Sequence, residues 1–306
     1  MSEKNKKPKV VVVLGPTASG KSDLAVELAI KFNGQVISAD SRQVYTGLDI
    51  GTGKITEEEM KGVPHHLLDV APPEKVFTVS DFKKLGEEAI NQILDRSKLP
   101  IICGGTGFYI EAILGETSIP EVPPNPELRE ELETKSVEEL FNILSKLDPE
   151  RAAVIDAKNK RRLVRAIEIC DALGSVPKRV ASSQHLESRK YDVLKVGMKI
   201  PDDELRERIN RRLEKRIEMG MIEEAEKLHE SGLSYNRMRE LGLEYGALAD
   251  FLSNKITKTE MIARLQTEIW QYAKRQITWF KRDKTIKWFN PKDYSTETEV
   301  ERFLKD

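Results

Sequence analysis

The chain has 306 residues, of which 39% are hydrophobic and 33% are charged, and these proportions exclude a wholly disordered chain. Its 50 basic and 51 acidic residues give a net charge of −1, so a bound polyanion would have to rely on local basic patches. No apolar run approaches the ~18 residues of a membrane span, and the two cysteines, Cys103 and Cys170, are too few for a disulfide framework. We therefore expect a cytoplasmic protein with no membrane partner.

Strand and helix patterns alternate through the first third of the chain. The uninterrupted apolar run in Lys9–Leu14 predicts a central parallel strand, and Asp23–Phe32 has the spacing of a helix. The next predicted elements are strands at Gln35–Ala39 and His65–Val70, a helix at Thr78–Ser97 that opens with a capping box, a strand at Leu99–Cys103, and a short helix after Gly107. Strands separated by crossovers at this spacing predict the helix-covered parallel sheet of P-loop NTPase-like α/β proteins.

A proline-rich segment interrupts this pattern at Pro120, Pro123, Pro124 and Pro126. Beyond it the sequence predicts helices near Glu127–Thr134, Val137–Ser145 and Lys160–Leu173, a polar loop at Ser175–Asp192, a strand at Val193–Ile200, helices at Asp202–Met219 and Thr259–Phe280, and a final strand at Trp288-Phe289. The predicted fold is an α/β core in two parts, residues 1–116 and 193–306, the second mostly helical. An all-helical domain at 117–192 is inserted between them.

The most specific motif follows the first predicted strand. Gly15-Pro16-Thr17-Ala18-Ser19-Gly20-Lys21-Ser22 fits the phosphate-loop pattern G-x-x-x-x-G-K-[ST], with a strand before it and a helix after it. Its glycines let backbone N–H groups wrap around phosphate oxygens, and the following helix contributes its positive N-terminal end. Lys21 would neutralise phosphate charge, and the hydroxyl of Ser22 could ligate Mg²⁺. The motif predicts a bound di- or triphosphate without specifying which.

The acidic residue that usually accompanies such a loop stands in an unusual place. The strand Leu99–Cys103 runs into Gly104-Gly105-Thr106 with no acid after it, whereas Asp40 follows the second strand. The carboxyl ends of parallel strands lie at the ligand-binding edge of such a sheet, beside the phosphate loop. Asp40 could therefore ligate Mg²⁺ through water, accept a proton from a nucleophile, or cap a turn.

Six segments taken together resemble one family. Besides the phosphate loop they are Asp40-Ser41-Arg42-Gln43-Val44-Tyr45, Val63-Pro64-His65-His66-Leu67-Leu68-Asp69, Gly104-Gly105-Thr106-Gly107-Phe108-Tyr109, Lys160-Arg161-Arg162-Leu163-Val164-Arg165-Ala166 and Tyr272-Ala273-Lys274-Arg275-Gln276-Ile277-Thr278-Trp279-Phe280. In this order, over residues 15–280, they resemble the tRNA dimethylallyltransferases, also called tRNA isopentenyltransferases.

The resemblance implies transfer of a dimethylallyl group from dimethylallyl diphosphate to N6 of the adenine 3′ of the anticodon, giving N6-isopentenyladenosine and diphosphate. It implies that the phosphate loop holds the donor's diphosphate, with Mg²⁺ as cofactor, and that no nucleotide is hydrolysed. As in the family, Asp40 would accept the amine proton and Thr106 would hydrogen-bond the diphosphate. The family's further catalytic arginine is best matched by Arg239, near Gly242-Leu243, where the family more often has Gly-Tyr.

The resemblance also implies a tRNA anticodon stem-loop as partner, with the target adenine flipped out of the loop. Ser41, Arg42 and Gln43 would bind the adenine beside Asp40 and Thr106. The other implied tRNA-binding positions are Arg129, Arg161, Arg162, Leu163, Val164 and Arg165. From the residues themselves, Lys158, Arg161, Arg162 and Arg165 are predicted to share a helix face that contacts phosphates. Arg275 and Gln276 are expected to brace the phosphate loop.

Three alternatives stand beside this interpretation. A small-molecule P-loop kinase would consume ATP, and an adenylate isopentenyltransferase would modify a free nucleotide without needing the inserted helices. An RNA-binding protein with an inert phosphate loop is disfavoured by the intact Lys21 and Ser22. For the main interpretation we expect a monomer.

Overall fold

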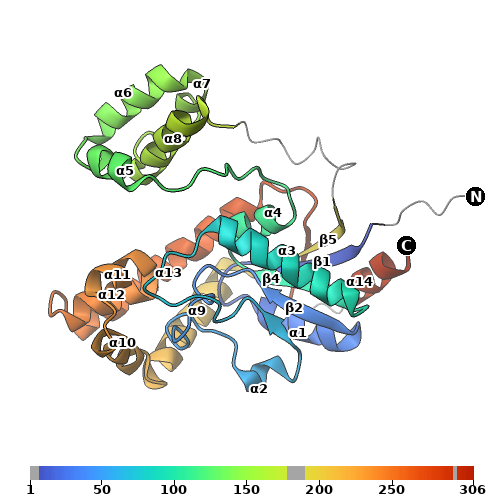
Figure 1. Ribbon diagram of the computed structural model, residues 1–306. Helices are drawn as coiled ribbons and strands as arrows, with labels where there is room; N and C mark the ends of the chain where they lie inside the picture. The colour runs from blue at the N-terminus through green and yellow to red at the C-terminus, as the bar shows by residue number, and fades with distance from the viewer. Residues whose placement is uncertain (1–6, 178–189, 292–294) are drawn as a thin grey trace, which may run out of the picture. The chain divides into compact units, whose positions relative to one another are not determined.

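The computed structural model describes residues 7–177, 190–291 and 295–306 (Figure 1). The chain divides into two compact units, which we call the core unit (Met1–Leu114 with Ser188–Asp306) and the helical unit (Gly115–Glu187). Each is described by itself. The partition at 1–116, 117–192 and 193–306, and a tRNA-clamping role for the middle part, stay predictions.

The core unit is built on a six-stranded parallel sheet with the order β3-β2-β4-β1-β5-β6. The strands are β1 (Lys9–Leu14), β2 (Gly34–Ser38), β3 (His65–His66), β4 (Leu99–Gly104), β5 (Asp192–Met198) and β6 (Lys287–Phe289). In the middle of the sheet Val11 pairs with Ile101 on one side and with Leu194 on the other. The predicted central strand and parallel α/β sheet are confirmed.

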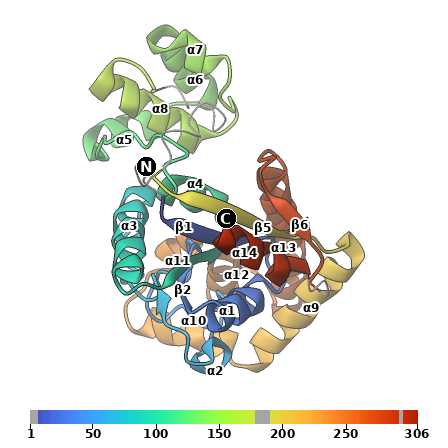
Figure 2. The same cartoon turned by 90° about the vertical axis from the view of Figure 1, so that its right-hand side faces the viewer.

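Helices cover both faces of this sheet because successive side chains of a strand point in opposite directions. Val10 and Val12 pack with side chains from α3 and α4, whereas Val11 and Val13 pack with side chains from α1 and α14. All four valines are fully buried, which explains the apolar sequence of β1. Figure 2 shows α3 and α1 on opposite sides of the sheet. These helices span α1 (Lys21–Lys31), α3 (Val79–Asp95), α4 (Gly107–Ile113) and α14 (Ser295–Lys305).

The helices between residues 202 and 280 form a further hydrophobic cluster with the segment that follows β2. Val44, Tyr45 and Leu48 from that segment pack against side chains of these helices. The residues that follow Asp40 are therefore anchored on the helices. The helices that complete the unit are α2 (Glu57–Met60), α9 (Asp202–Glu218), α10 (Met221–Glu230), α11 (Tyr235–Leu241), α12 (Leu243–Leu252) and α13 (Lys258–Phe280). None of the helices in the described ranges is long and apolar enough to cross a bilayer.

Several predicted boundaries were wrong for local reasons. The predicted strand His65–Val70 is only two residues long, because Leu67 and Asp69 have φ angles of 66° and 55°, which end the extended backbone. The short helices α2 and α7 and the terminal helix α14 were not predicted. In the predicted loop Ser175–Asp192, residues 178–189 lie outside the described residues, and Asp192 begins β5.

The helical unit contains α5 (Pro126–Glu133), α6 (Val137–Leu147), α7 (Pro149–Ala152) and α8 (Lys160–Leu173). Asn125, Ser136 and Asn159 cap three of these helices by accepting hydrogen bonds from backbone N–H groups of the first turn. Leu140, Leu144 and Leu163 are fully buried in its own hydrophobic core. The three helices predicted here are confirmed.

A buried carboxylate joins α5 to α8 in this unit. Glu168 is 1% exposed and accepts hydrogen bonds from Arg129, from Arg165 and from the backbone N–H of Asn125. Burial alone would raise the pKa of Glu168, but the hydrogen bonds from Arg129, Asn125 and Arg165 lower it to about 2. The two arginines are thus part of the internal structure of the unit.

We expect Glu168→Gln to lower the stability of the helical unit by about 2 kcal/mol at pH 7, because the neutral amide leaves two guanidinium groups without their anion. Since the folded pKa lies below the reference value of 4.5, the carboxylate stabilises the unit fully above pH 5 and loses this effect as the pH falls toward 2. Hydrogen exchange of α5 and α8 at pH 7 and at pH 3 measures the difference. The exposed Glu130→Gln is the control, and an equal loss at both pH values would contradict the role of the charge.

Candidate active site

The phosphate loop, residues 15–22, leaves the carboxyl end of β1 and runs into α1. Gly20 has a φ of 81°, a conformation that favours glycine, and α1 begins immediately after it, two residues earlier than predicted. At Gly15 an added Cβ would lie 2.9 Å from Ser19 Oγ and 3.1 Å from Met198 Cβ. The motif glycines are therefore required by close packing and by backbone conformation, as the loop pattern predicts.

Gln276 of α13 braces this loop. Its Oε1 accepts a hydrogen bond from the backbone N–H of Thr17 at 2.9 Å, and its Nε2 donates to the carbonyl of Gly105 at 3.0 Å. Gln276 is 5% exposed, and a Cβ on Gly105 would come within 2.1 Å of its Nε2. The predicted bracing role of Gln276 is confirmed, whereas Arg275 lines the adjoining cavity.

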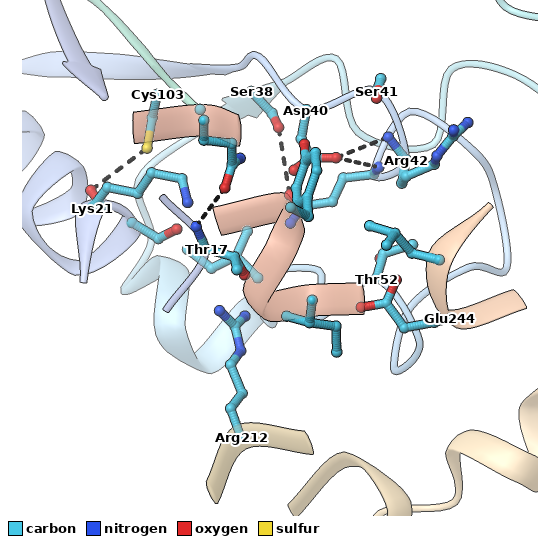
Figure 3. Close-up of a pocket in the computed structure, with 18 of the residues that line it drawn as sticks. Thr17, Lys21, Ser38, Asp40, Ser41, Arg42, Thr52, Cys103, Arg212 and Glu244 are labelled. Atoms are coloured by element: carbon cyan, nitrogen blue, oxygen red, sulfur yellow. Dashed lines mark hydrogen bonds between the residues drawn. The ribbon is translucent and has the colours of Figure 1, made fainter. Parts of the chain in front are cut away.

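The cavity of about 390 Å³ lies beside the phosphate loop at the carboxyl ends of the strands (Figure 3). Most of its polar lining comes from six parts of the core unit. From the loop come Thr17, Lys21 and Ser22; after β2 come Asp40, Ser41, Arg42 and Gln43; β4 supplies Cys103 and Gly104; α9 supplies Arg212; and the helices α12 and α13 supply Glu244, Tyr272, Arg275 and Gln276. The sequence prediction brought the first two groups together correctly.

Lys21 is the principal cation of the loop. Burial lowers its pKa, the negative charge of Asp40 opposes that shift, and the positive charge of Arg212 adds to it. Its Nζ donates to the carbonyl of Pro16 at 3.2 Å. A diphosphate bound here would supply the negative charge that favours protonated Lys21. Burial raises the pKa of the neighbouring Cys103 thiol to about 11, so this cysteine is protonated and is a poor nucleophile.

Asp40 stands at the start of the turn after β2. Its Oδ1 accepts hydrogen bonds from the backbone N–H groups of Arg42 at 2.8 Å and Gln43 at 3.4 Å, so one oxygen fixes the turn (Figure 3). Oδ2 accepts no hydrogen bond from the described residues, and the side chain lines the cavity. Of the three roles considered for Asp40, the turn-capping role is observed at Oδ1, and it leaves Oδ2 available for either of the other two.

Thr106 lies one layer behind the cavity lining. It precedes α4 without capping it through its side chain, and its Oγ1 accepts a hydrogen bond from the backbone N–H of Ser41 at 3.1 Å. Tyr272, whose pKa is raised by burial and by the charge of Asp40, also hydrogen-bonds Thr106. Thr106 is thus close to the turn that carries Asp40, although it does not line the cavity itself.

Arg239, the predicted leaving-group arginine, is not brought to the cavity. Its Nε donates to Asp250 Oδ1 at 2.7 Å, and its other nitrogens donate to Asn236 and Ser253. Arg212 of α9 lines the cavity instead, with Nη2 2.9 Å from the carbonyl of Gly53. The sequence analysis missed Arg212 because α9 is dense in alternating charge, so that no single arginine stands out. The usable signal was its place at one-turn spacing between Arg208 and Arg216, next to the buried Leu213.

The predicted tRNA-binding residues lie in four different environments. Ser41, Arg42 and Gln43 line the cavity of the core unit. In the helical unit Arg161 and Arg162 are exposed, whereas Arg129 and Arg165 are held by Glu168. Two predictions are corrected. The side chains of Leu163 and Val164 are buried in the core of the helical unit, and Lys158 precedes α8 rather than lying on its face.

The residues at the cavity fit a magnesium ion that takes most of its ligands from a substrate. No group of three or more His, Cys, Asp or Glu side chains in the described ranges could hold a metal by itself. Ser22 and Asp40 nevertheless line the same cavity beside the phosphate loop. Mg²⁺ commonly binds one or two protein oxygens and completes its coordination with phosphate oxygens and water.

Fold and site together define a phosphate-loop α/β protein in which the cavity beside the loop also contains a carboxylate, Asp40. Residues 43–283 match the sequence model of the family described as IPP transferase. The chain is 39% identical to the tRNA dimethylallyltransferase of Halalkalibacterium halodurans, over 96% of this chain and 95% of that protein. It is 40% identical to that of Anoxybacillus flavithermus, over 97% and 94%. The chain therefore belongs to the IPP transferase family.

Solved structures are similar over the same length. The tRNA isopentenylpyrophosphate transferase of Bacillus halodurans matches with a TM-score of 0.71 and 38% identity, covering 98% of this chain and 96% of that one. A eukaryotic dimethylallyltransferase acting on tRNA matches with a TM-score of 0.78 and 27% identity, covering 96% and 77%. The resemblance to the tRNA dimethylallyltransferases read from the sequence motifs is confirmed.

Proposed function

We propose that the protein transfers a dimethylallyl group from dimethylallyl diphosphate to N6 of the adenine 3′ of the anticodon in tRNA. Its family carries out transfer to tRNA adenine, and its relatives bear that name. The observation that carries the finer proposal is the shared cavity, in which the phosphate-loop Lys21 and the carboxylate of Asp40 face the same space. An anionic leaving group and a base are needed at opposite ends of such a reaction.

The diphosphate end would be held by the loop amides, Lys21 and Arg212. As the C–O bond of the donor breaks, negative charge grows on the leaving diphosphate. These groups stabilise that charge because they are already oriented toward it and need not reorganise as water would. Ser22 would hold Mg²⁺, which adds positive charge beside the diphosphate when it is bound. Thr106 would hydrogen-bond the diphosphate, as the family resemblance implies; it does not line the cavity in the structure, where it is held between Ser41 and Tyr272.

The adenine end would be held by the turn that follows β2. The N6 amine is a weak nucleophile because its lone pair is delocalised into the ring. Its nitrogen forms the new C–N bond to the allylic carbon while Asp40 Oδ2 takes the N6 proton and diphosphate leaves with the C–O electrons. Gln43 both donates and accepts hydrogen bonds, which suits an adenine edge, and it lines the cavity next to Asp40.

The tRNA phosphates would contact the exposed basic end of α8. Replacing Arg161 and Arg162 with alanine is expected to weaken tRNA binding about tenfold at 150 mM salt. The salt slope of log Kd should fall by about 1.5, because two phosphate contacts are lost. Filter binding over a range of salt concentrations measures both. Lys146→Ala, an exposed lysine on α6, is the control, and an unchanged slope in the double variant would remove α8 from the RNA surface.

One experiment separates this function from its alternatives. The protein is incubated with Mg²⁺, labelled dimethylallyl diphosphate, and either unmodified tRNA or free adenosine monophosphate. We expect label in tRNA only. Label in the free nucleotide only would identify an adenylate isopentenyltransferase, and label in neither acceptor would point to a kinase or to an inert RNA-binding protein. We further propose that the enzyme works as a monomer in the cytoplasm, which light scattering and cell fractionation test.

A further inference from the structure

A short turn that contributes Thr52 to the cavity lining joins the two substrate-binding sides. Residues 48–54 form this turn, closed by hydrogen bonds from Gly53 N to the Ile50 carbonyl at 3.0 Å and from Lys54 N to the Asp49 carbonyl at 2.9 Å. We call it the linking turn. The carbonyl oxygen of Gly53 accepts hydrogen bonds from Arg212 Nη2 at 2.9 Å and from Gln43 Nε2 at 3.3 Å. One backbone oxygen therefore orients a residue from each end of the proposed reaction.

The other side of the linking turn is anchored on a single carboxylate, Glu224 of α10. Its Oε2 accepts the backbone N–H groups of Asp49 at 3.0 Å and Ile50 at 2.7 Å. Its Oε1 accepts the backbone N–H of Gly51 at 2.9 Å and the hydroxyl of Tyr245 at 2.5 Å. Three consecutive amides that converge on one anion form a nest, which binds a negative charge much more strongly than a neutral group.

Close packing leaves this anchored turn little freedom. A Cβ at Gly51 would lie 2.7 Å from the hydroxyl oxygen of Tyr245, so the backbone rests directly on that ring. The carbonyl of Gly51 accepts a hydrogen bond from Arg216 Nη1 at 2.6 Å. Arg216 is 8% exposed and also donates to Glu244, which lines the cavity. The turn is thus tied to α9, α10 and α12 at once.

We propose that Glu224 is a positioning residue for the reaction. By binding the amides at positions 49–51 it fixes the Gly53 carbonyl, and that carbonyl in turn orients Arg212 toward the diphosphate and Gln43 toward the adenine. Glu224 does not line the cavity, so it would act without touching either substrate. The inference rests on the proposed function, since it assumes that Arg212 and Gln43 contact the donor and the tRNA.

The test is Glu224→Gln, with inorganic diphosphate as the first probe. The amide keeps the size of the side chain but replaces one acceptor oxygen with an N–H₂ group, which would face backbone N–H groups. We expect the Kd for diphosphate, measured calorimetrically, to rise about tenfold, and kcat to fall by a similar factor, because a small displacement of binding groups is costly. Glu226→Gln, an exposed residue of the same helix, is the matched control and should equal the wild type.

A double-mutant cycle distinguishes positioning from general loosening of the fold. If Glu224 acts through Arg212, then adding Glu224→Gln to Arg212→Ala should raise the Kd for diphosphate by no more than about twofold. A full tenfold effect in both backgrounds would overturn the inference, as would an unchanged Kd and kcat in the single variant. A wild-type protein that binds diphosphate but transfers no dimethylallyl group would instead overturn the proposed function, and the cycle on diphosphate binding would still test Glu224.

Discussion

Replacing Asp40 with asparagine is expected to lower kcat about a thousandfold and to leave the affinity for tRNA within about threefold of the wild type. The amide oxygen can still accept the hydrogen bonds from the backbone of Arg42 and Gln43, so the turn after β2 keeps its shape. What the amide cannot do is take a proton from N6. Single-turnover transfer and equilibrium tRNA binding, measured on the same preparation, separate the two effects.

The matched control for this variant is Asp95→Asn, an exposed aspartate at the end of α3 that should be neutral. Asp40→Ala serves as the comparison that also breaks the turn, and it should weaken tRNA binding more than Asp40→Asn does. If Asp40→Asn lost tRNA affinity as severely as it lost kcat, Asp40 would be a binding residue and the assignment as base would be wrong.

The core of the fold was predictable because its sequence signals are local. The apolar run of β1 and the spacing of the phosphate loop each have one common structural outcome, and the structure has both. Asp40 could also be placed, since strand ends in a parallel sheet lie at one edge. By contrast, the two-residue length of β3 depends on the left-handed backbone at Leu67 and Asp69. Neither residue is a glycine, so the sequence does not indicate this backbone conformation.

The parts that could not be predicted depend on partners distant in sequence. Nothing near Arg165 in the basic run indicates that it donates to Glu168 together with Arg129, because that pairing needs α5 packed on α8. In the same run Leu163 and Val164 lie between Arg162 and Arg165 yet face the core, since the residues of one helical turn point to different sides of the helix. The linking turn is likewise invisible in the sequence, because Glu224 meets it from more than 170 residues away.

Arg212 provides the second prediction with a large expected effect. Replacing Arg212 with alanine should lower kcat/KM for dimethylallyl diphosphate about a hundredfold, because a preorganised cation is removed from the developing charge of the leaving group. Arg239→Ala should lower it less than threefold, since that guanidinium is bound to Asp250 outside the cavity. Its main effect should be a loss of stability of about 1 kcal/mol, limited because Arg264 still pairs with Asp250.

Steady-state kinetics on Arg212→Ala, Arg239→Ala and the exposed Arg206→Ala, which lies on the same helix as Arg212, decide between the two arginines. Loss of transfer in the Arg239 variant with normal folding, and little change in the Arg212 variant, would restore the assignment made from the sequence motif. The expected order of effects, Arg212 far above Arg239 and Arg206, would place the leaving-group cation on α9. It would also explain why the linking turn holds that side chain through the carbonyl of Gly53.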